Sequence, residues 1–123
     1  MDAIEEAVAQ LEGRGFKVCR LSEGGSPVLI ISEYPLPRGW SKPTTRLLVK
    51  LPPSYPSGKP DMFWTDPDLK VANGNEPEKA SLLQPICGES WRRFSWHPQS
   101  WTPGRDDIST YLEFIDRRLA QAK

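Results

Sequence analysis

Two side chains suited to chemistry lie in the segment between positions 81 and 107. Cys87 stands in the polar sequence SLLQPICGES, where proline, glycine and polar neighbours offer a thiol few apolar partners. His97, the only histidine of the chain, follows in the same segment. A thiolate is a nucleophile, and an imidazole can relay a proton near neutral pH. The segment therefore indicates Cys87 as a candidate nucleophile. His97 is either a proton relay or a ring packed among aromatic neighbours.

Three tryptophans, Trp91, Trp96 and Trp101, follow Cys87 in this segment. Tryptophan side chains bury large areas in cores and also dominate recognition surfaces. Two interpretations stay open from the residues alone. The tryptophans either anchor a long loop in the core or build a platform around Cys87.

Other kinds of site lack the residues that they need. One histidine and two distant cysteines do not make the clustered ligand set of a zinc site. The glycines of EGGS and NGN lack the spacing and the following helix of a phosphate-binding loop. No serine is framed as a nucleophile elbow. We therefore expect no metal and no cofactor.

Length and charge limit the class of protein and its partners. A chain of 123 residues is enough for one domain with a single core, which we expect to span residues 1–123. Sixteen basic and sixteen acidic residues cancel, which argues against nucleic acid or an anionic membrane as the main partner. The longest apolar run, 28–31, is too short to span a bilayer, and the acidic start is unlike a secretory signal. We expect a cytoplasmic protein.

Two segments have helical periodicity. In residues 2–12, apolar side chains recur on one face, with Asp2 as a candidate N-cap. The second segment, Asp106–Ala120, repeats the pattern, with Asp106 or Asp107 as its cap. These patterns predict an N-terminal and a C-terminal helix.

Between the two helices we expect four strands and a long irregular segment. Runs rich in β-branched and aromatic residues predict the strands at 16–21, 27–36, 44–51 and 61–65. We expect Cys19 to be a small buried side chain of the first strand, and Phe63 and Trp64 to be core. Segment 66–101 has no periodicity, and an irregular stretch of this length is either functional or contains elements that the pattern does not reveal. The predicted fold is α+β: helix, four-stranded antiparallel meander, irregular active-site segment, helix.

The order of these pieces resembles the ubiquitin-conjugating (UBC) fold. The matching sequences are LPPSYPSGKPDMFWT, then PICGES, and then SWTPGRDDISTYLEFI. In that fold a Tyr-Pro corner and a proline-containing turn lead into an aromatic fourth strand, and Tyr55, Pro56 and Phe63 match these features. A cysteine follows in an Ile-Cys context, as at Cys87. A Trp-x-Pro then precedes the next helix, as at Trp101.

More narrowly, the chain is similar to the shortened bacterial proteins known as prokaryotic family E of the ubiquitin-conjugating-like proteins. That group tends to show a Pro-Asp-Met-Phe fourth strand, which residues 60–63 match. It also carries Trp, Ser and His ahead of Trp-x-Pro-Gly-x-Asp. Here those residues are Trp91, Ser95, His97, Trp101, Pro103, Gly104 and Asp106.

The resemblance implies an acyl carrier in a bacterial modification pathway, for example one in antiviral defence. A ubiquitin-like protein would pass from an activating enzyme to Cys87 as a thioester, and from there to a target protein. The backbone amides of Gly88 and Glu89 are candidate oxyanion donors, and His97 would deprotonate the nucleophile or hold the loop. Trp91 and Trp101 are expected to contribute to binding.

The chain departs from the enzyme pattern in one important place. The eukaryotic enzymes carry His-Pro-Asn before the cysteine, where the amide stabilises the oxyanion. Here Asp66–Asp68 occupies a loosely similar place, and a carboxylate repels an oxyanion. Asn73 and Asn75 are nearby amides without a firm alignment. An inactive UBC-like module that binds a ubiquitin-like protein or its activating enzyme is therefore the alternative, and an unrelated α+β adaptor is a third.

Overall fold

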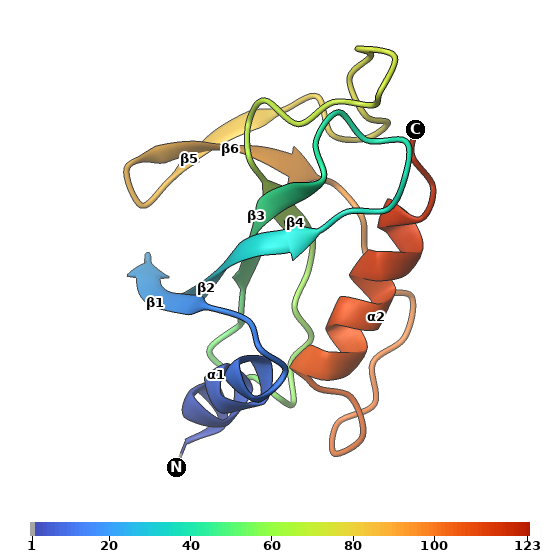
Figure 1. Cartoon of the computed structure of the whole chain (residues 1–123). Helices are drawn as coiled ribbons and strands as arrows, with labels where there is room; N and C mark the ends of the chain where they lie inside the picture. Colours follow the sequence, from blue (N-terminus) through green and yellow to red (C-terminus); the bar gives the residue numbers. More distant parts are fainter. Residues whose placement is uncertain (1) are drawn as a thin grey trace.

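The computed structural model describes residues 2–123 and has two helices and one curled sheet (Figure 1). Two helices and six strands make up the regular structure. They are α1 (Ala3–Gly13), β1 (Val18–Glu23), β2 (Ser26–Pro35), β3 (Thr44–Lys50), β4 (Phe63–Thr65), β5 (Leu83–Ile86), β6 (Glu89–Phe94) and α2 (Ile108–Leu119). The α+β class predicted from the sequence is confirmed.

The sheet has six antiparallel strands, in the order β1-β2-β3-β4-β6-β5, and not the four that we predicted. The two additional strands come from segment 66–101, which has no strand pattern in its sequence. Pro85 lies inside β5, and proline normally argues against a strand. β5 forms because it is the outermost strand and pairs only with β6, while β6 pairs with β4.

Both helices lie on one face of the sheet and enclose the main core. Leu29 and Ile31 of β2 point into this core together with Phe63 of β4. The helix caps were predicted correctly. Asp2 accepts the Glu5 N–H at 2.7 Å, and Asp107 accepts the N–H groups of the first turn of α2. The apolar faces of both helices point toward the sheet, because their side chains share the main core with those of β2 and β4.

The opposite face of the sheet has a second, smaller core. It consists of buried side chains from five strands: Val28, Ile30, Leu48, Trp64, Ile86 and Trp91. Val28 and Ile30 alternate with Leu29 and Ile31 along β2, so this strand is buried on both faces and reads as an unbroken apolar run. The second core exists because the β5–β6 hairpin curls over this face and brings Trp91 with it.

The Tyr-Pro corner joins the sheet to the start of α2. The Tyr55 hydroxyl accepts the N–H of Ile108, the first residue of the helix, at 2.8 Å. Tyr111 donates from its hydroxyl to the backbone carbonyl of Met62, and Trp101 donates from Nε1 to the carbonyl of Pro56 at 2.9 Å. The peptide bond between Tyr55 and Pro56 is cis. These contacts attach the loop before α2 to the β3–β4 connection.

Cys19 is exposed, which corrects the prediction that it is buried. β1 is an edge strand, and most of its residues are exposed on both faces. Alternation along a strand predicts burial only where another layer covers one of its faces. Phe63 and Trp64 are buried, as predicted. Within residues 2–123, no helix is both long enough and apolar enough to cross a membrane.

Candidate functional site

Cys87 lies at the tip of the β5–β6 hairpin. Ile86 pairs with Glu89, so Cys87 and Gly88 form a two-residue turn between the strands. Both have positive φ angles, 51° for Cys87 and 81° for Gly88, as hairpin turns of this length require. A positive φ is uncommon for cysteine, and strained backbone of this kind is concentrated at functional sites. The turn places a half-buried cysteine after the buried Ile86 and before two exposed residues, Gly88 and Glu89.

The hairpin tip contacts the far end of β1. The backbone N–H of Cys87 donates to the Glu23 carboxylate at 2.9 Å, and the Cys87 thiol lies 3.7 Å from the carbonyl oxygen of Ser22. The pKa of the Cys87 thiol is raised, mainly by partial burial and next by the adjacent Glu23 carboxylate. The thiol is therefore mainly protonated at neutral pH, and any partner or change that moves Glu23 away would favour the thiolate.

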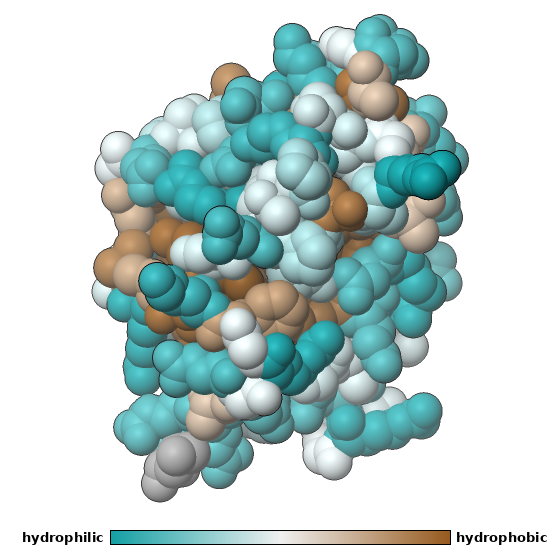
Figure 2. Space-filling view, in the orientation of Figure 1, coloured by the Kyte–Doolittle hydropathy of each residue, from teal (hydrophilic) through white to brown (hydrophobic). Residues whose placement is uncertain are grey.

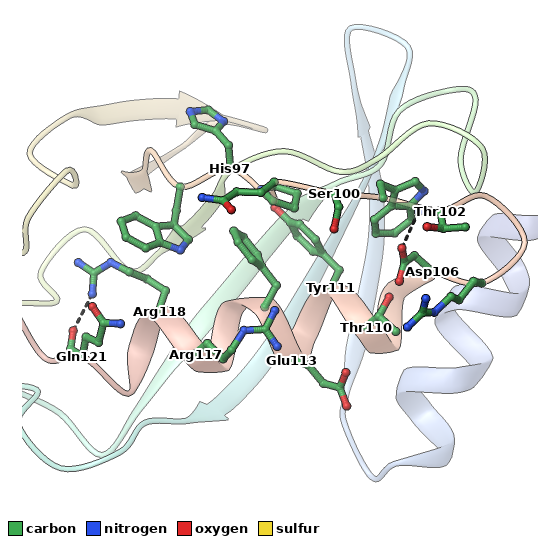
Figure 3. Close-up of a pocket in the computed structure, with 16 residues that line it drawn as sticks. His97, Ser100, Thr102, Asp106, Thr110, Tyr111, Glu113, Arg117, Arg118 and Gln121 are labelled. Carbon is green, nitrogen blue, oxygen red and sulfur yellow. Dashed lines mark hydrogen bonds between the residues drawn. The ribbon is translucent and has the colours of Figure 1, made fainter.

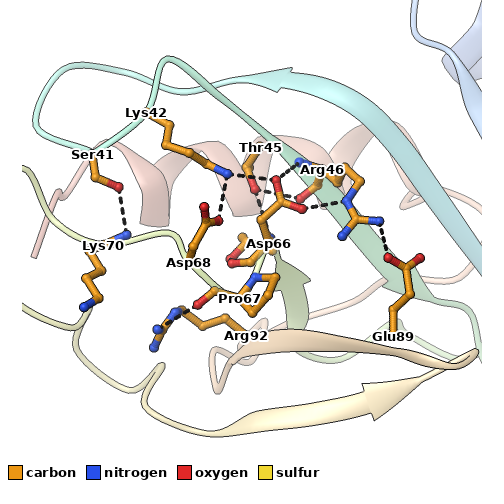
Figure 4. Close-up of polar contacts among 11 residues, drawn as sticks. Ser41, Lys42, Thr45, Arg46, Asp66, Pro67, Asp68, Lys70, Glu89 and Arg92 are labelled. Carbon is orange, nitrogen blue, oxygen red and sulfur yellow. Dashed lines mark hydrogen bonds and ion pairs between the residues drawn. The ribbon is translucent and has the colours of Figure 1, made fainter.

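Glu89 belongs to an ion-pair network beside the hairpin (Figure 4). Its carboxylate binds Arg46 at 2.9 Å, and Arg46 binds Asp66 at 2.6 Å. Lys42 bridges Asp66 and Asp68 at 3.0 and 2.9 Å. Burial opposes ionisation of Asp66, but hydrogen bonds from Arg46 and Lys42 outweigh it and hold the pKa of this carboxyl below its usual value. The Asp66–Asp68 segment thus supplies paired carboxylates and no amide donor for an oxyanion.

Trp91 is part of the second core and is fully buried. Its Nε1 donates to the carbonyl of Ile86 at 3.2 Å, and the Arg46 guanidinium lies 4.3 Å from the centre of its ring. Trp91 therefore anchors the hairpin and has no exposed area to offer a partner. Of the two interpretations left open for the tryptophans, Trp91 fits the first: it is a core side chain packed beneath the turn.

His97 and Trp101 lie beyond the other end of β6, in the loop before α2. Six strand residues separate Cys87 and Gly88 from that loop, which corresponds to about 20 Å at 3.3 Å per residue. His97 Nδ1 is 2.5 Å from Asp61 Oδ1, and the His97 ring is exposed. At this separation His97 cannot take a proton from Cys87, so its contact with Asp61 supports the loop-holding role.

A groove of about 630 Å³ lies between the loop before α2 and α2 itself (Figure 3). His97 and Trp101 line it on the loop side, and Phe114 and Arg117 line it on the helix side. Neither Cys87 nor Gly88 reaches this groove. Asn73 and Asn75, the amides considered as oxyanion donors, lie in the connection between β4 and β5, where the Asn73 side chain accepts the N–H of Asn75 at 2.9 Å. The residues expected in one site therefore occupy two ends of the sheet.

The sequence analysis missed several residues in these contacts, among them Glu23 and Asp61. Glu23 precedes Gly24 and Gly25 in a hairpin turn, and its contact with Cys87 joins residues 64 positions apart. No local pattern signals a contact of that range. Asp61 is the first residue of the expected fourth strand, and nothing in that strand indicates a histidine partner. Among residues 2–123, no group of three or more potential ligand side chains is placed to hold a metal ion.

One comparison with known proteins gave a match. The family model described as prokaryotic E2 family E covers residues 4–122, which is nearly the whole chain. No curated protein and no solved structure matched.

Proposed function

The chain belongs to prokaryotic E2 family E, and on this premise we propose that it is a UBC-like acyl carrier of a bacterial pathway. In this proposal Cys87 accepts a ubiquitin-like protein as a thioester from an activating enzyme and then passes it to a target. The observation that carries the proposal is the placement of Cys87 at a positive-φ hairpin tip, directly followed by the exposed Gly88 and Glu89. A protein-sized acyl donor needs this kind of access.

The proposed reaction is an exchange between two thioesters. The Cys87 sulfur attacks the C-terminal carbonyl of the ubiquitin-like protein, and a new C–S bond forms through a tetrahedral intermediate. The bond to the cysteine of the activating enzyme breaks, and that sulfur takes up the proton released by Cys87. Bonds of the same kind are made and broken, so the reaction is nearly isoenergetic. The raised pKa of Cys87 slows this exchange without preventing it.

Gly88 supplies the preferred oxyanion donor in this mechanism. The Glu89 N–H belongs to the closing pair with Ile86, and the Cys87 N–H is bound by Glu23. Gly88 is exposed, and nothing within 4 Å would meet a side chain at this position, so an acyl group has room to approach. Backbone N–H groups directed at a developing oxyanion lower the barrier to acyl transfer.

His97 and Trp101 are assigned to the loop before α2 in this proposal. The His97–Asp61 contact and the Trp101–Pro56 hydrogen bond hold that loop against the β3–β4 connection. Trp101 is partly exposed beside the groove, so it remains a candidate contact for a partner protein.

The test combines the chain with the activating enzyme and ubiquitin-like protein of its own genome and ATP. We expect an adduct on a non-reducing gel that thiols remove. Cys87→Ala should abolish the adduct, Cys87→Ser should replace it with a thiol-resistant ester, and the matched Cys19→Ser variant should retain it. An adduct that survives Cys87→Ala would refute the assignment.

The alternative function is a non-catalytic binding or scaffolding module for the same two partners. Glu23 favours this alternative, because its carboxylate binds the N–H of Cys87 and raises the pKa of the thiol. Binding of the ubiquitin-like protein or its activating enzyme without any adduct would support the module over the carrier.

A further inference from the structure

The outer edge of β1 has open backbone hydrogen-bonding groups. Glu23 and Ser26 flank the two-residue turn Gly24–Gly25, whose φ angles are 56° and 85°. The residues that close such a turn form a hydrogen-bonded pair, and the pairing alternates along an antiparallel ladder. Glu23, Leu21 and Cys19 therefore bond to β2. The backbone groups of the intervening residues point outward: Val18, Arg20 and Ser22.

Contacts on both sides of β1 agree with this alternation. The carbonyl of Lys17 points inward, because it accepts the N–H of Ser32 at 3.0 Å. The carbonyl of Ser22 points outward, because it meets the thiol of Cys87. In the part of the chain that the structure describes, β1 is the terminal strand and no other backbone segment pairs with its outer edge.

The other sheet edge, at β5, offers fewer free backbone donors. Ile86 closes the two-residue turn at Cys87–Gly88, so Pro85 and Leu83 are the residues of β5 whose backbone groups point outward. Pro85 has no N–H and interrupts the row of donors, which is a common means of protecting an edge strand. β1 contains no proline, so only its edge offers an unbroken row.

The surface around the edge of β1 is exposed and partly apolar. The residues from Cys19 to Ser22 are exposed, and Leu21 is one of the few large apolar side chains that remain at the surface, with 40% of its area accessible. Figure 2 shows apolar surface on the left of the molecule, where Figure 1 places β1 and β2. An added strand would find both backbone partners and an apolar contact there.

This open edge ends at Cys87. β1 runs from Val18 toward Glu23, and its last two residues contact the hairpin tip. We propose that the free edge of β1 binds the C-terminal tail of the ubiquitin-like protein as an added strand and delivers its terminal carbonyl to Cys87. This inference rests on the proposed function and specifies how the acyl donor is held.

The position of Cys87 fixes the direction and length of the bound tail. Its C-terminus must arrive beside Ser22, so the tail runs parallel to β1. The distance from Val18 to Ser22 is about 13 Å at 3.3 Å per residue, which an extended tail of about four residues spans. Main-chain hydrogen bonds supply most of the affinity in strand addition of this kind. The edge therefore accepts a range of tail sequences.

The first experiment locates the tail directly. The ¹⁵N-labelled chain is titrated with the peptide acetyl-Val-Thr-Val-Gly-Gly-amide and followed by NMR. We expect the amide signals of Val18, Arg20 and Ser22 to shift most, and those of Cys19 and Leu21 to shift less. Shifts confined to other parts of the chain, or no shifts along β1, would overturn the proposal.

A matched pair of variants tests the role of the backbone. Arg20→Pro removes an outward N–H without touching the ladder to β2, whereas Arg20→Ala removes the side chain and keeps the N–H. We expect Arg20→Pro to abolish the shifts and Arg20→Ala to retain them. The remaining β1 and β2 signals report whether each variant is folded. A folded Arg20→Pro that binds the peptide as well as wild type contradicts the proposal.

The second experiment links the edge to the reaction. The same peptide, as a thioester of mercaptoethanesulfonate, is compared with the acetyl thioester in acylation of Cys87, in a Cys19→Ser background. Each backbone hydrogen bond contributes about a factor of five, so two bonds should favour the peptide by at least about tenfold. Arg20→Pro removes one of these bonds and should lower the advantage about fivefold, whereas Arg20→Ala should keep it.

The outcomes separate the two proposals. Equal acylation by both probes in wild type refutes binding of the tail at the edge of β1 and leaves Cys87 as an acyl acceptor. If neither probe acylates Cys87, the carrier function fails, and the NMR titration alone then decides whether the edge of β1 binds an extended chain.

Discussion

Replacing Trp91 with phenylalanine should loosen the hairpin that carries Cys87. The change deletes the buried hydrogen bond from Nε1 to the Ile86 carbonyl, which costs about 1 kcal/mol. It removes ring atoms from a fully buried site, with lost burial and residual cavity together costing about 1 kcal/mol. It also weakens the contact with the half-exposed Arg46, which costs about 0.5 kcal/mol. The expected loss in the free energy of unfolding is about 2.5 kcal/mol.

Two measurements check this prediction. Urea denaturation, followed by circular dichroism, gives the change in the free energy of unfolding. The rate of Cys87 alkylation in a Cys19→Ser background reports opening of the hairpin tip. We expect faster alkylation in Trp91→Phe, because the thiol packs against the second core that Trp91 fills.

Trp101→Phe is the matched control. It makes the same change of side chain and also deletes an Nε1 hydrogen bond, to the carbonyl of Pro56. Trp101 is only partly buried and lies beyond the other end of β6, so we expect a loss of about 1 kcal/mol and unchanged alkylation of Cys87. Equal alkylation rates in Trp91→Phe and wild type would refute the anchoring role of Trp91.

Three further predictions follow from single contacts. Glu23→Gln removes the carboxylate beside the thiol, so the pKa of Cys87 should fall. The pH–rate profile of Cys87 alkylation should then move to lower pH, and an unmoved profile would argue against the contact. Tyr55→Phe leaves the buried N–H of Ile108 without a partner, and denaturation should show a loss of about 1–2 kcal/mol, whereas an unchanged midpoint excludes this hydrogen bond. The pKa of Asp66 is lowered in the folded state, so its contribution to stability is present above its unfolded pKa of about 4 and is lost as pH falls through the folded pKa. Asp66→Asn should therefore make the free energy of unfolding fall less steeply at acid pH. An unchanged pH dependence would contradict the ion-pair geometry.

Features with a local cause were predicted well. The helices were expected at 2–12 and Asp106–Ala120 and are found at Ala3–Gly13 and Ile108–Leu119. Caps and helical periodicity depend on residues within a few positions of one another, so the sequence carries this information directly. The first four strands were located to within two residues at nearly every end for the same reason.

The β5–β6 hairpin was missed because its cause is not local. Segment 66–101 has no alternation, and Pro85 argues against a strand. The hairpin forms because β4 offers a partner to β6 and because Trp91 fills the second core. A pairing of this kind depends on a surface that exists only after the meander has folded.

Local sequence patterns were enough to predict the α+β class, the helices and the resemblance to a family that the chain proved to match. The sequence also indicated that Cys87 stands in a loop, because glycine, proline and polar neighbours act over a few residues. The surroundings of that thiol depend on contacts that form when the sheet folds. The fold brings Glu23 to the N–H of Cys87 and holds His97 beyond the other end of β6. The curl of the sheet sets both relations, and that curl arises from strand pairing and core packing between residues far apart in the chain.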